Sequence, residues 1–148
     1  MKFQKVKLQM VKETAEEYTT PAIKSTIDIV NFINKQERYD LSPNEKLIVI
    51  GLDTKSKINI YTEVVSGAGN YASFAIADIF KPLLISNSTR FILVHNHPSG
   101  DATPSTDDLI TTKEVQKVAD MMKIKFLDHI VIGENNFVSI MSILREGK

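Results

Sequence analysis

The sequence of 148 residues contains no cysteine and no tryptophan. Without cysteine the chain forms neither disulfides nor thiolate metal sites, so any bound metal must use His, Asp or Glu. The chain also lacks an excess of either charge, since Lys+Arg and Asp+Glu both number 18. Dedicated nucleic-acid-binding proteins are usually basic, so this balance argues against that class, although it leaves room for a local basic patch.

Long apolar runs are missing as well. No run approaches the roughly 18 residues that a transmembrane helix needs, and the first residues, MKFQKVK, lack the apolar core of a signal peptide. We therefore expect a cytoplasmic protein with no membrane partner. Hydrophobic residues make up 43% of the chain, which suffices for one core, and the length predicts that residues 1–148 form a single domain.

The hydrophobic pattern alternates between the periods of strands and helices. It predicts an edge strand over 3–10, strands over 46–52 and 57–65 joined by a turn at 53–56, and strands at 91–94, 126–132 and 137–140. Helices are expected over 21–36, 74–86 and 105–122. This order favours a mixed α/β fold, in which helices flank a mixed sheet.

Several details of these elements can be tested. Thr20 is expected to cap the first helix, whose first turn would hold Pro21. Pro82 predicts a kink or an early end of the second helix. The third helix would bury one stripe of apolar side chains, which consists of Leu109, Val115, Val118, Ala119 and Met122. The tail 145–148 should fray.

Two histidines follow the apolar strand at 91–94. His95 and His97 are two residues apart, and side chains at positions i and i+2 of a strand lie on the same face. Both imidazoles should therefore point one way and Asn96 the other. Pairing should stop at Pro98, which cannot donate a backbone hydrogen bond.

A helix with an acid in its first turn comes next. Ser105 has the character of an N-cap, and Asp108 lies three residues further on. Asp108 can face back toward His95 and His97, which would make a three-ligand set with an open fourth position, as in a catalytic zinc site. The same Ser-x-x-Asp spacing is also that of a capping box, and a His-x-His pair can be ordinary polar residues at a sheet rim.

These residues together resemble a known family. The stretch 95–101, Pro104–Ser105 and Asp108 is similar to the motif of the RadC family of JAMM/MPN-like (JAB) metalloproteins, and 128–139 resembles its C-terminal strand pair. The resemblance runs from about Glu45 to Ile140. It implies a JAMM/MPN-like, cytidine-deaminase-like sandwich over 45–140, preceded here by a strand and a helix. RadC proteins usually also carry an N-terminal helix-hairpin-helix region, which the residues before Glu45 do not resemble.

The resemblance also implies a metal site. Zn²⁺ would be bound by His95, His97 and Asp108, and Ser105 would polarise the scissile carbonyl or steady the oxyanion. A glutamate before an earlier strand is the general acid/base of JAMM peptidases, and Glu45 matches that position. Glu63 is the rival for the role of general acid/base. Without that role it would be an outward-facing residue of the sheet.

Two further polar residues have more than one interpretation. Asp101 is either a partner of a ligand imidazole or a turn residue, and the turn is the simpler interpretation. His129, beside Asp128 in a predicted strand, is expected to be a hydrogen-bonded strand histidine rather than a ligand.

The family resemblance favours a zinc-dependent hydrolase that cuts peptide or isopeptide bonds. One alternative is an accessory protein of DNA repair or recombination, for which the neutral charge gives no physical support. Another is a metal-binding interaction module without turnover, against which the complete ligand set argues.

Overall fold

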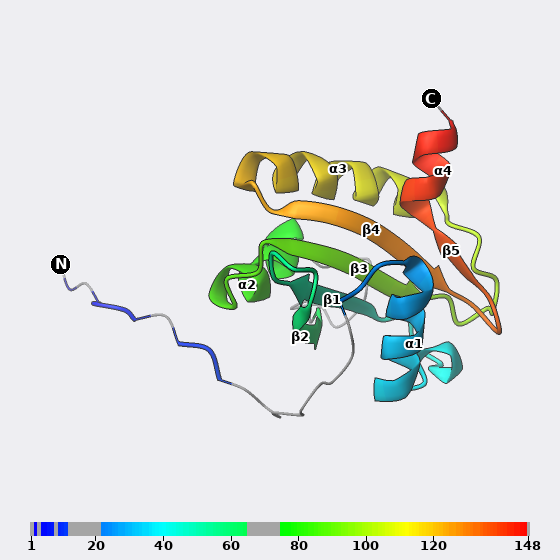
Figure 1. The fold of residues 1–148 in the computed structure, drawn as a ribbon, viewed down its shortest axis with the longest axis horizontal. Helices are drawn as coiled ribbons and strands as arrows, with labels where there is room; N and C mark the ends of the chain where they lie inside the picture. Colours follow the sequence, from blue (N-terminus) through cyan, green and yellow to red (C-terminus); the bar gives the residue numbers. More distant parts are fainter. Residues whose placement is uncertain (1, 3, 8, 12–21, 65–74, 148) are drawn as a thin grey trace.

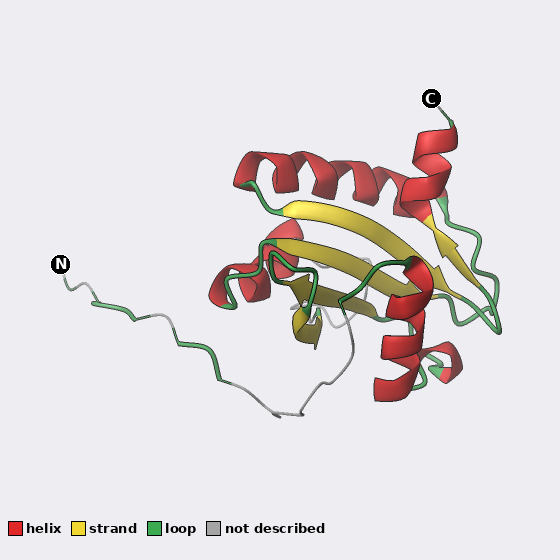
Figure 2. Cartoon of the chain, in the orientation of Figure 1, coloured by secondary structure: helices red, strands yellow, loops and turns green. Residues whose placement is uncertain are grey.

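A computed structural model describes residues 2, 4–7, 9–11, 22–64 and 75–147. This part of the chain forms a mixed five-stranded sheet with helices packed around it (Figures 1 and 2). The α/β architecture predicted from the sequence is therefore confirmed. The elements in chain order are α1 (Thr26–Gln36), a 3₁₀ helix η1 (Tyr39–Leu41), β1 (Leu47–Leu52), β2 (Ile58–Glu63), α2 (Ile76–Ile85), β3 (Arg90–Asn96), α3 (Thr106–Met122), β4 (Lys125–Ile132), β5 (Phe137–Ser139) and α4 (Ile140–Glu146).

The strand order is β2-β1-β3-β4-β5. The central strand β3 runs antiparallel to β1, with Leu47 opposite His95. It runs parallel to β4, with Leu93 opposite His129, and α3 makes the crossover between them. The sheet thus brings the start of β1 beside the ends of β3 and β4, close to His95.

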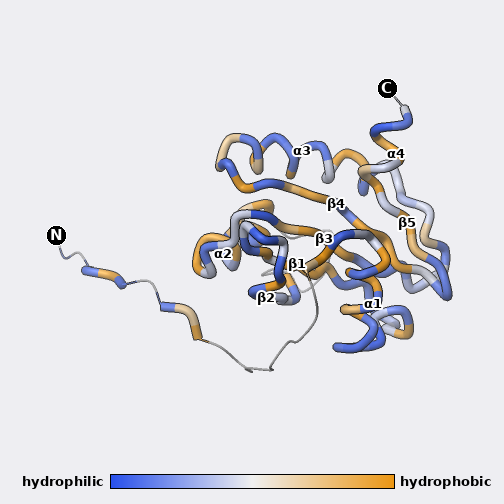
Figure 3. Tube along the Cα trace, in the orientation of Figure 1, coloured by the Kyte–Doolittle hydropathy of each residue, from blue (hydrophilic) through white to orange (hydrophobic). Residues whose placement is uncertain are grey.

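Both faces of the sheet are covered, which explains the uninterrupted burial of β1. Apolar residues run through β1 and β3, the middle of the sheet (Figure 3). Alternate side chains divide between two cores. One core joins α1 to residues such as Ile48, Ile92 and Ile130. The other joins α2 and α3 to residues such as Val49 and Leu93, and its face also carries His95.

Helix α1 begins later than the sequence suggested. The described residues 22–25 are not helical, and Ser25 rather than Thr20 is the N-cap. The Asp28 carboxylate accepts hydrogen bonds from the backbone N–H groups of Lys24 (2.9 Å) and Ser25 (3.0 Å). These bonds satisfy donors at the helix start and fix where it begins. The predicted cap Thr20 and Pro21 lie outside the described residues.

Helix α2 continues past Pro82 to Ile85, so the expectation of an early end was wrong. Pro82 removes one helical hydrogen bond. However, Ile79, Phe80 and Leu83 are buried on either side of it. Their packing in the core shared with Phe91 offsets that loss.

Helix α4 extends to Glu146, so the prediction of a frayed tail was wrong for Arg145 and Glu146. Buried Ile140 begins α4. The Asp128 carboxylate accepts hydrogen bonds from the Ser139 hydroxyl (2.9 Å) and the Met141 N–H (3.3 Å). Burial raises the pKa of Asp128 above its ordinary value, and these hydrogen bonds oppose the shift.

Two other expectations fail. The described residues from Lys2 to Val11 form neither helix nor strand, so the edge strand over 3–10 is not present among them. Met122, expected in the buried stripe of α3, is 39% exposed, while polar Thr112 is fully buried instead. None of the helices in the described ranges has the length and apolarity to cross a bilayer.

Candidate metal centre

The two histidines of the motif lie at the end of β3, as predicted. His95 is fully buried on the face covered by α3, and His97 follows just beyond the strand. The His97 N–H donates to the Ile132 carbonyl (2.9 Å), which extends the contact with β4 by one residue. The His97 ring is held by a bond from its Nδ1 to the Asp101 carbonyl oxygen (2.8 Å).

The turn that follows His97 is anchored to the turn between β4 and β5. Gly100 has a φ of +85°, a conformation that favours glycine. Its carbonyl accepts the N–H of Glu134 (2.8 Å). Gly133 packs so closely against the Gly100 carbonyl that an added Cβ would collide with it. This contact fixes the path of the chain between the histidines and α3.

The first turn of α3 supplies the carboxylate. The Ser105 Oγ accepts from the Asp108 N–H (3.1 Å), and the Asp108 carboxylate accepts from the Ser105 N–H (2.8 Å). This is a capping box, so the simple interpretation of the Ser-x-x-Asp spacing holds. The same carboxylate also contacts both histidines, so capping and membership of the site are not alternatives: the cap aims Asp108 at the imidazoles.

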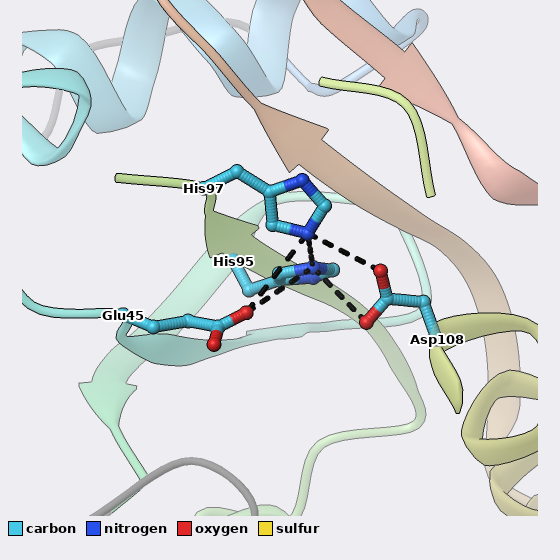
Figure 4. A group of neighbouring side chains, drawn as sticks. All are labelled: Glu45, His95, His97 and Asp108. Atoms are coloured by element: carbon cyan, nitrogen blue, oxygen red, sulfur yellow. Dashed lines mark hydrogen bonds and ion pairs between the residues drawn. The ribbon is translucent and has the colours of Figure 1, made fainter. Parts of the chain in front are cut away.

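Four side chains converge at the centre (Figure 4). The Nε2 atoms of His95 and His97 are 2.9 Å apart. Asp108 lies 3.3 Å from the first and 3.2 Å from the second. On the opposite side of the rings, Glu45 Oε1 lies 4.0 and 3.9 Å from the same two nitrogens. One ligand atom from each residue falls within 4.8 Å of all the others, so the group can hold a metal ion.

Asp108 remains an anion at the heart of this cluster. Burial opposes its ionisation, but the contact with His95 and the hydrogen bond from the Ser105 N–H hold the pKa of the carboxyl well below its ordinary value. A buried carboxylate beside two imidazole nitrogens creates a strongly negative local potential. Such a potential attracts a cation.

Glu45 is placed by a buried residue that points away from the histidines. Asn96 is 1% exposed. Its Oδ1 accepts from the Lys46 N–H (2.8 Å) and its Nδ2 donates to the Asn44 carbonyl (3.0 Å). Asn96 therefore holds the backbone on both sides of Glu45. The orientation of Asn96 follows from the alternation of side chains along the strand, whereas this contact depends on the pairing of β1 with β3.

Glu63, the rival to Glu45, lies outside the cluster. It is exposed at the end of β2, where its carboxylate pairs with the Lys46 ammonium at 3.5 Å. Of the two candidates, only Glu45 lies beside His95 and His97.

The structure decides between the interpretations of Asp101 and His129. Asp101 does hold a motif histidine, but through its backbone carbonyl. Its carboxylate accepts from the Thr103 N–H (2.9 Å), as expected of a turn residue. His129 is a hydrogen-bonded strand histidine, as predicted, yet its partner is His95 at 2.8 Å. Burial and the neighbouring His95 lower the pKa of His129 well below its ordinary value.

The donor atoms suit a small tetrahedral cation. A carbonyl oxygen only accepts, so the bond to Asp101 places a hydrogen on His97 Nδ1 and leaves the Nε2 lone pair of the neutral ring facing the cluster. Zinc bonds of about 2.0–2.2 Å set tetrahedral ligand atoms about 3.3–3.6 Å apart. The separations of Asp108 from the two nitrogens, 3.2 and 3.3 Å, fit that spacing, and the 2.9 Å between the nitrogens is slightly short.

Similarity to known proteins extends over most of this chain. A sequence model of the RadC-like JAB domain matches residues 23–146. Relatives named "UPF0758 protein" include one from Carboxydothermus hydrogenoformans, 35% identical over 75% of this chain and 52% of its own length. Another, from Clostridium perfringens (strain 13), is 36% identical over 84% of this chain and 54% of its own.

A third relative of that name, from Roseiflexus castenholzii, is 41% identical over 65% of this chain and 41% of its own length. The chain thus spans about half the length of the curated relatives it matches, or somewhat less. The match covers α1 to α4 and includes all four residues of the cluster. The chain belongs to the RadC family, and its fold is that of a RadC-like JAB domain.

Proposed function

We propose that this protein is a zinc-dependent hydrolase of peptide or isopeptide bonds. One observation carries the proposal: two imidazole nitrogens and a carboxylate lie within 3.3 Å of one another, with a second carboxylate just beyond them. Nitrogen and oxygen donors of this kind, with three protein ligands and an open position, are typical of catalytic zinc. His95, His97 and Asp108 would hold the ion.

The proposed reaction needs a Lewis acid and a proton carrier. When bound, zinc polarises a carbonyl and lowers the pKa of a coordinated water to about 7. A nearby carboxylate must still accept the proton of the attacking water and pass it to the leaving amine.

Glu45 fits the role of proton carrier. Its Oε1 lies 3.9–4.0 Å from the two histidine nitrogens, further than the 3.2–3.3 Å of Asp108. It therefore borders the three proposed ligands on the side of the rings opposite Asp108. Asn96 keeps it there through the backbone.

Ser105 is proposed to bind the carbonyl oxygen of the substrate. Its Oγ accepts the Asp108 N–H and does not use its hydroxyl hydrogen in that bond. Because the serine caps α3 next to the carboxylate, a hydrogen bond from its hydroxyl would stabilise negative charge that develops on the substrate oxygen.

The test compares Glu45→Gln with Glu63→Gln. Both variants remove one carboxylate from the same end of the sheet, but only Glu45 belongs to the cluster. Both should retain about one zinc per chain, measured by elemental analysis. Activity would be followed by mass spectrometry on a peptide library and a Gly–Lys isopeptide library. A general base is worth about 10²–10⁴ in rate.

We expect Glu45→Gln to lose cleavage by about that factor and Glu63→Gln to match the parent. Equal cleavage by Glu45→Gln and the parent would remove Glu45 from the mechanism. A parent protein that carries zinc but cleaves no member of either library would contradict the hydrolase proposal and favour a metal-binding module.

A further inference from the structure

We propose that Thr112 and His129 are positioning residues that fix the tautomer of His95, so that its Nε2 is free of hydrogen and faces the metal. The role as a metal-site support rests on the proposed function, but the placement of a hydrogen on His95 Nδ1 does not require a metal. Neither residue is exposed, so neither can touch a substrate. Their effect must pass through His95.

The three residues form a buried chain of short hydrogen bonds. His95 Nδ1 lies 2.8 Å from His129 Nε2. His129 Nδ1 lies 2.7 Å from the Thr112 hydroxyl oxygen. The Thr112 hydroxyl in turn donates to the backbone carbonyl of Asp108 (2.7 Å), the residue one helical turn earlier. This series of hydrogen bonds thus starts at the proposed ligand His95 and ends on the backbone of the proposed ligand Asp108.

The Thr112 hydroxyl sets the donor–acceptor direction of these hydrogen bonds. A carbonyl oxygen cannot donate, so the single hydroxyl hydrogen of Thr112 points to the Asp108 carbonyl. The Thr112 oxygen can then only accept from His129. This requires a hydrogen on His129 Nδ1.

The same reasoning carries over to His95. A neutral His129 with its hydrogen on Nδ1 has an unprotonated Nε2, which can only accept. Full burial favours the neutral ring, since the charged form would lose its hydration. The bond between the rings therefore places a hydrogen on His95 Nδ1. A His95 ring that carries its single hydrogen there presents its Nε2 lone pair to Asp108 and His97, where a metal would bind.

The hydrogen bonds also form a closed circuit. His95 Nε2 lies 3.3 Å from the Asp108 carboxylate, so His95, His129, Thr112 and Asp108 form a circuit through β3, β4 and α3. It links the orientation of the imidazole to that of the first turn of α3. In other metal sites, loss of such a support costs about 10–100-fold in metal affinity or activity.

The first test is histidine nitrogen NMR on the metal-free full chain. Long-range ¹H–¹⁵N spectra distinguish a ring nitrogen that carries hydrogen from one that does not. We expect hydrogen on Nδ1 of both His95 and His129, and none on Nε2 of His129. Thr112→Val removes the hydroxyl without changing the size of the side chain much, and it should mix or reverse the His129 tautomer. A parent protein with hydrogen on His129 Nε2 would overturn the proposal.

The second test is zinc affinity, measured by competition with a chromophoric chelator. Thr112→Val should bind zinc about 10–100-fold more weakly than the parent, whereas Thr112→Ser, which keeps the hydroxyl, should bind nearly as well. A purely structural role predicts a lower melting temperature for Thr112→Val with an unchanged zinc affinity and an unchanged His95 tautomer. That result would refute the proposal.

A second pair of variants covers the possibility that Thr112→Val does not fold. His129→Gln keeps an oxygen that can accept from His95 Nδ1, and His129→Leu does not. Zinc affinity should be retained in the first and lost in the second, and equal affinities would overturn the proposal. If the parent binds no zinc, the proposed function fails, while the NMR result on the metal-free chain still decides the tautomer.

Discussion

Asp108→Asn should separate the metal role of this residue from its helix-capping role. The amide keeps an oxygen that can accept the Ser105 N–H, so the cap of α3 is preserved. The substitution removes the carboxylate that lies nearest to both histidine nitrogens among the described residues. Asp107→Asn is the matched control, because Asp107 lies in the same first turn of α3 but is exposed and outside the cluster.

The size of the effect follows from binding linkage. Free zinc at a hundredfold excess over its Kd stabilises the folded state by about 2.7 kcal/mol. For a chain of 148 residues, 1 kcal/mol corresponds to about 3–4 °C in Tm. The parent and Asp107→Asn should therefore gain about 8–11 °C. Asp108→Asn should gain almost nothing at that zinc concentration. Without metal, Asp108→Asn should be the less stable of the two variants at pH 7, because it loses the interactions that lower the pKa of Asp108.

Calorimetry with and without zinc, at pH 7 and fixed protein concentration, measures these differences. The pH must stay well above 4, because a carboxylate whose pKa is lowered by folding contributes stability above its unfolded pKa. That stability is lost as the pH falls through the folded value. A full zinc-dependent gain in Asp108→Asn would show that Asp108 is not a ligand. Loss of the gain in Asp107→Asn would show that the effect arises from the helix terminus.

Three further changes test the surroundings of the centre. Asn96→Ala removes the two backbone hydrogen bonds that flank Glu45, so urea titration should show a loss of about 1–3 kcal/mol; elemental analysis should still find about one zinc per chain, and cleavage should fall. Gly133→Ala drives a Cβ into the turn that follows the motif histidines; it should lower the free energy of unfolding by about 1–3 kcal/mol and weaken zinc binding in the chelator assay. Burial raises the pKa of Asp128, and Arg145 opposes the shift. The folded carboxyl therefore holds its proton to a higher pH than the unfolded one. The free energy of unfolding should then fall as the pH rises from about 4 through the folded pKa. Asp128→Asn keeps an oxygen for the hydrogen bonds and should abolish that decline in urea titrations between pH 4 and pH 7; an unchanged decline would contradict the assignment.

The sequence by itself determined the part of the centre that depends on short-range geometry. Two histidines two residues apart in a strand must share a face, and an acid three residues after a serine cap must face the start of its helix. His95, His97 and Asp108 come from one strand, one turn and one helix start, so their convergence could be predicted locally. The family resemblance then indicated Glu45 as the fourth member.

Local patterns were least reliable where packing competes with propensity. Pro82 lies within α2 because buried neighbours on both sides hold the helix together. The end of the chain is helical because Ile140 is buried against Val131 and the Asp128 carboxylate holds the backbone there. Neither the burial nor the distant carboxylate can be recognised from the residues of the segment alone.

Only the tertiary structure decided how the centre is supported. Pairing of β1 with β3 places Leu47 opposite His95, and Asn96 then holds the segment that carries Glu45 while Glu63 pairs with Lys46. Pairing of β3 with β4 brings His129 beneath His95, where Thr112 meets it from α3. Periodicity tells which side chains of a strand share a face. It does not tell which strands become neighbours, and a hydrogen-bond chain across three elements exists only once they do.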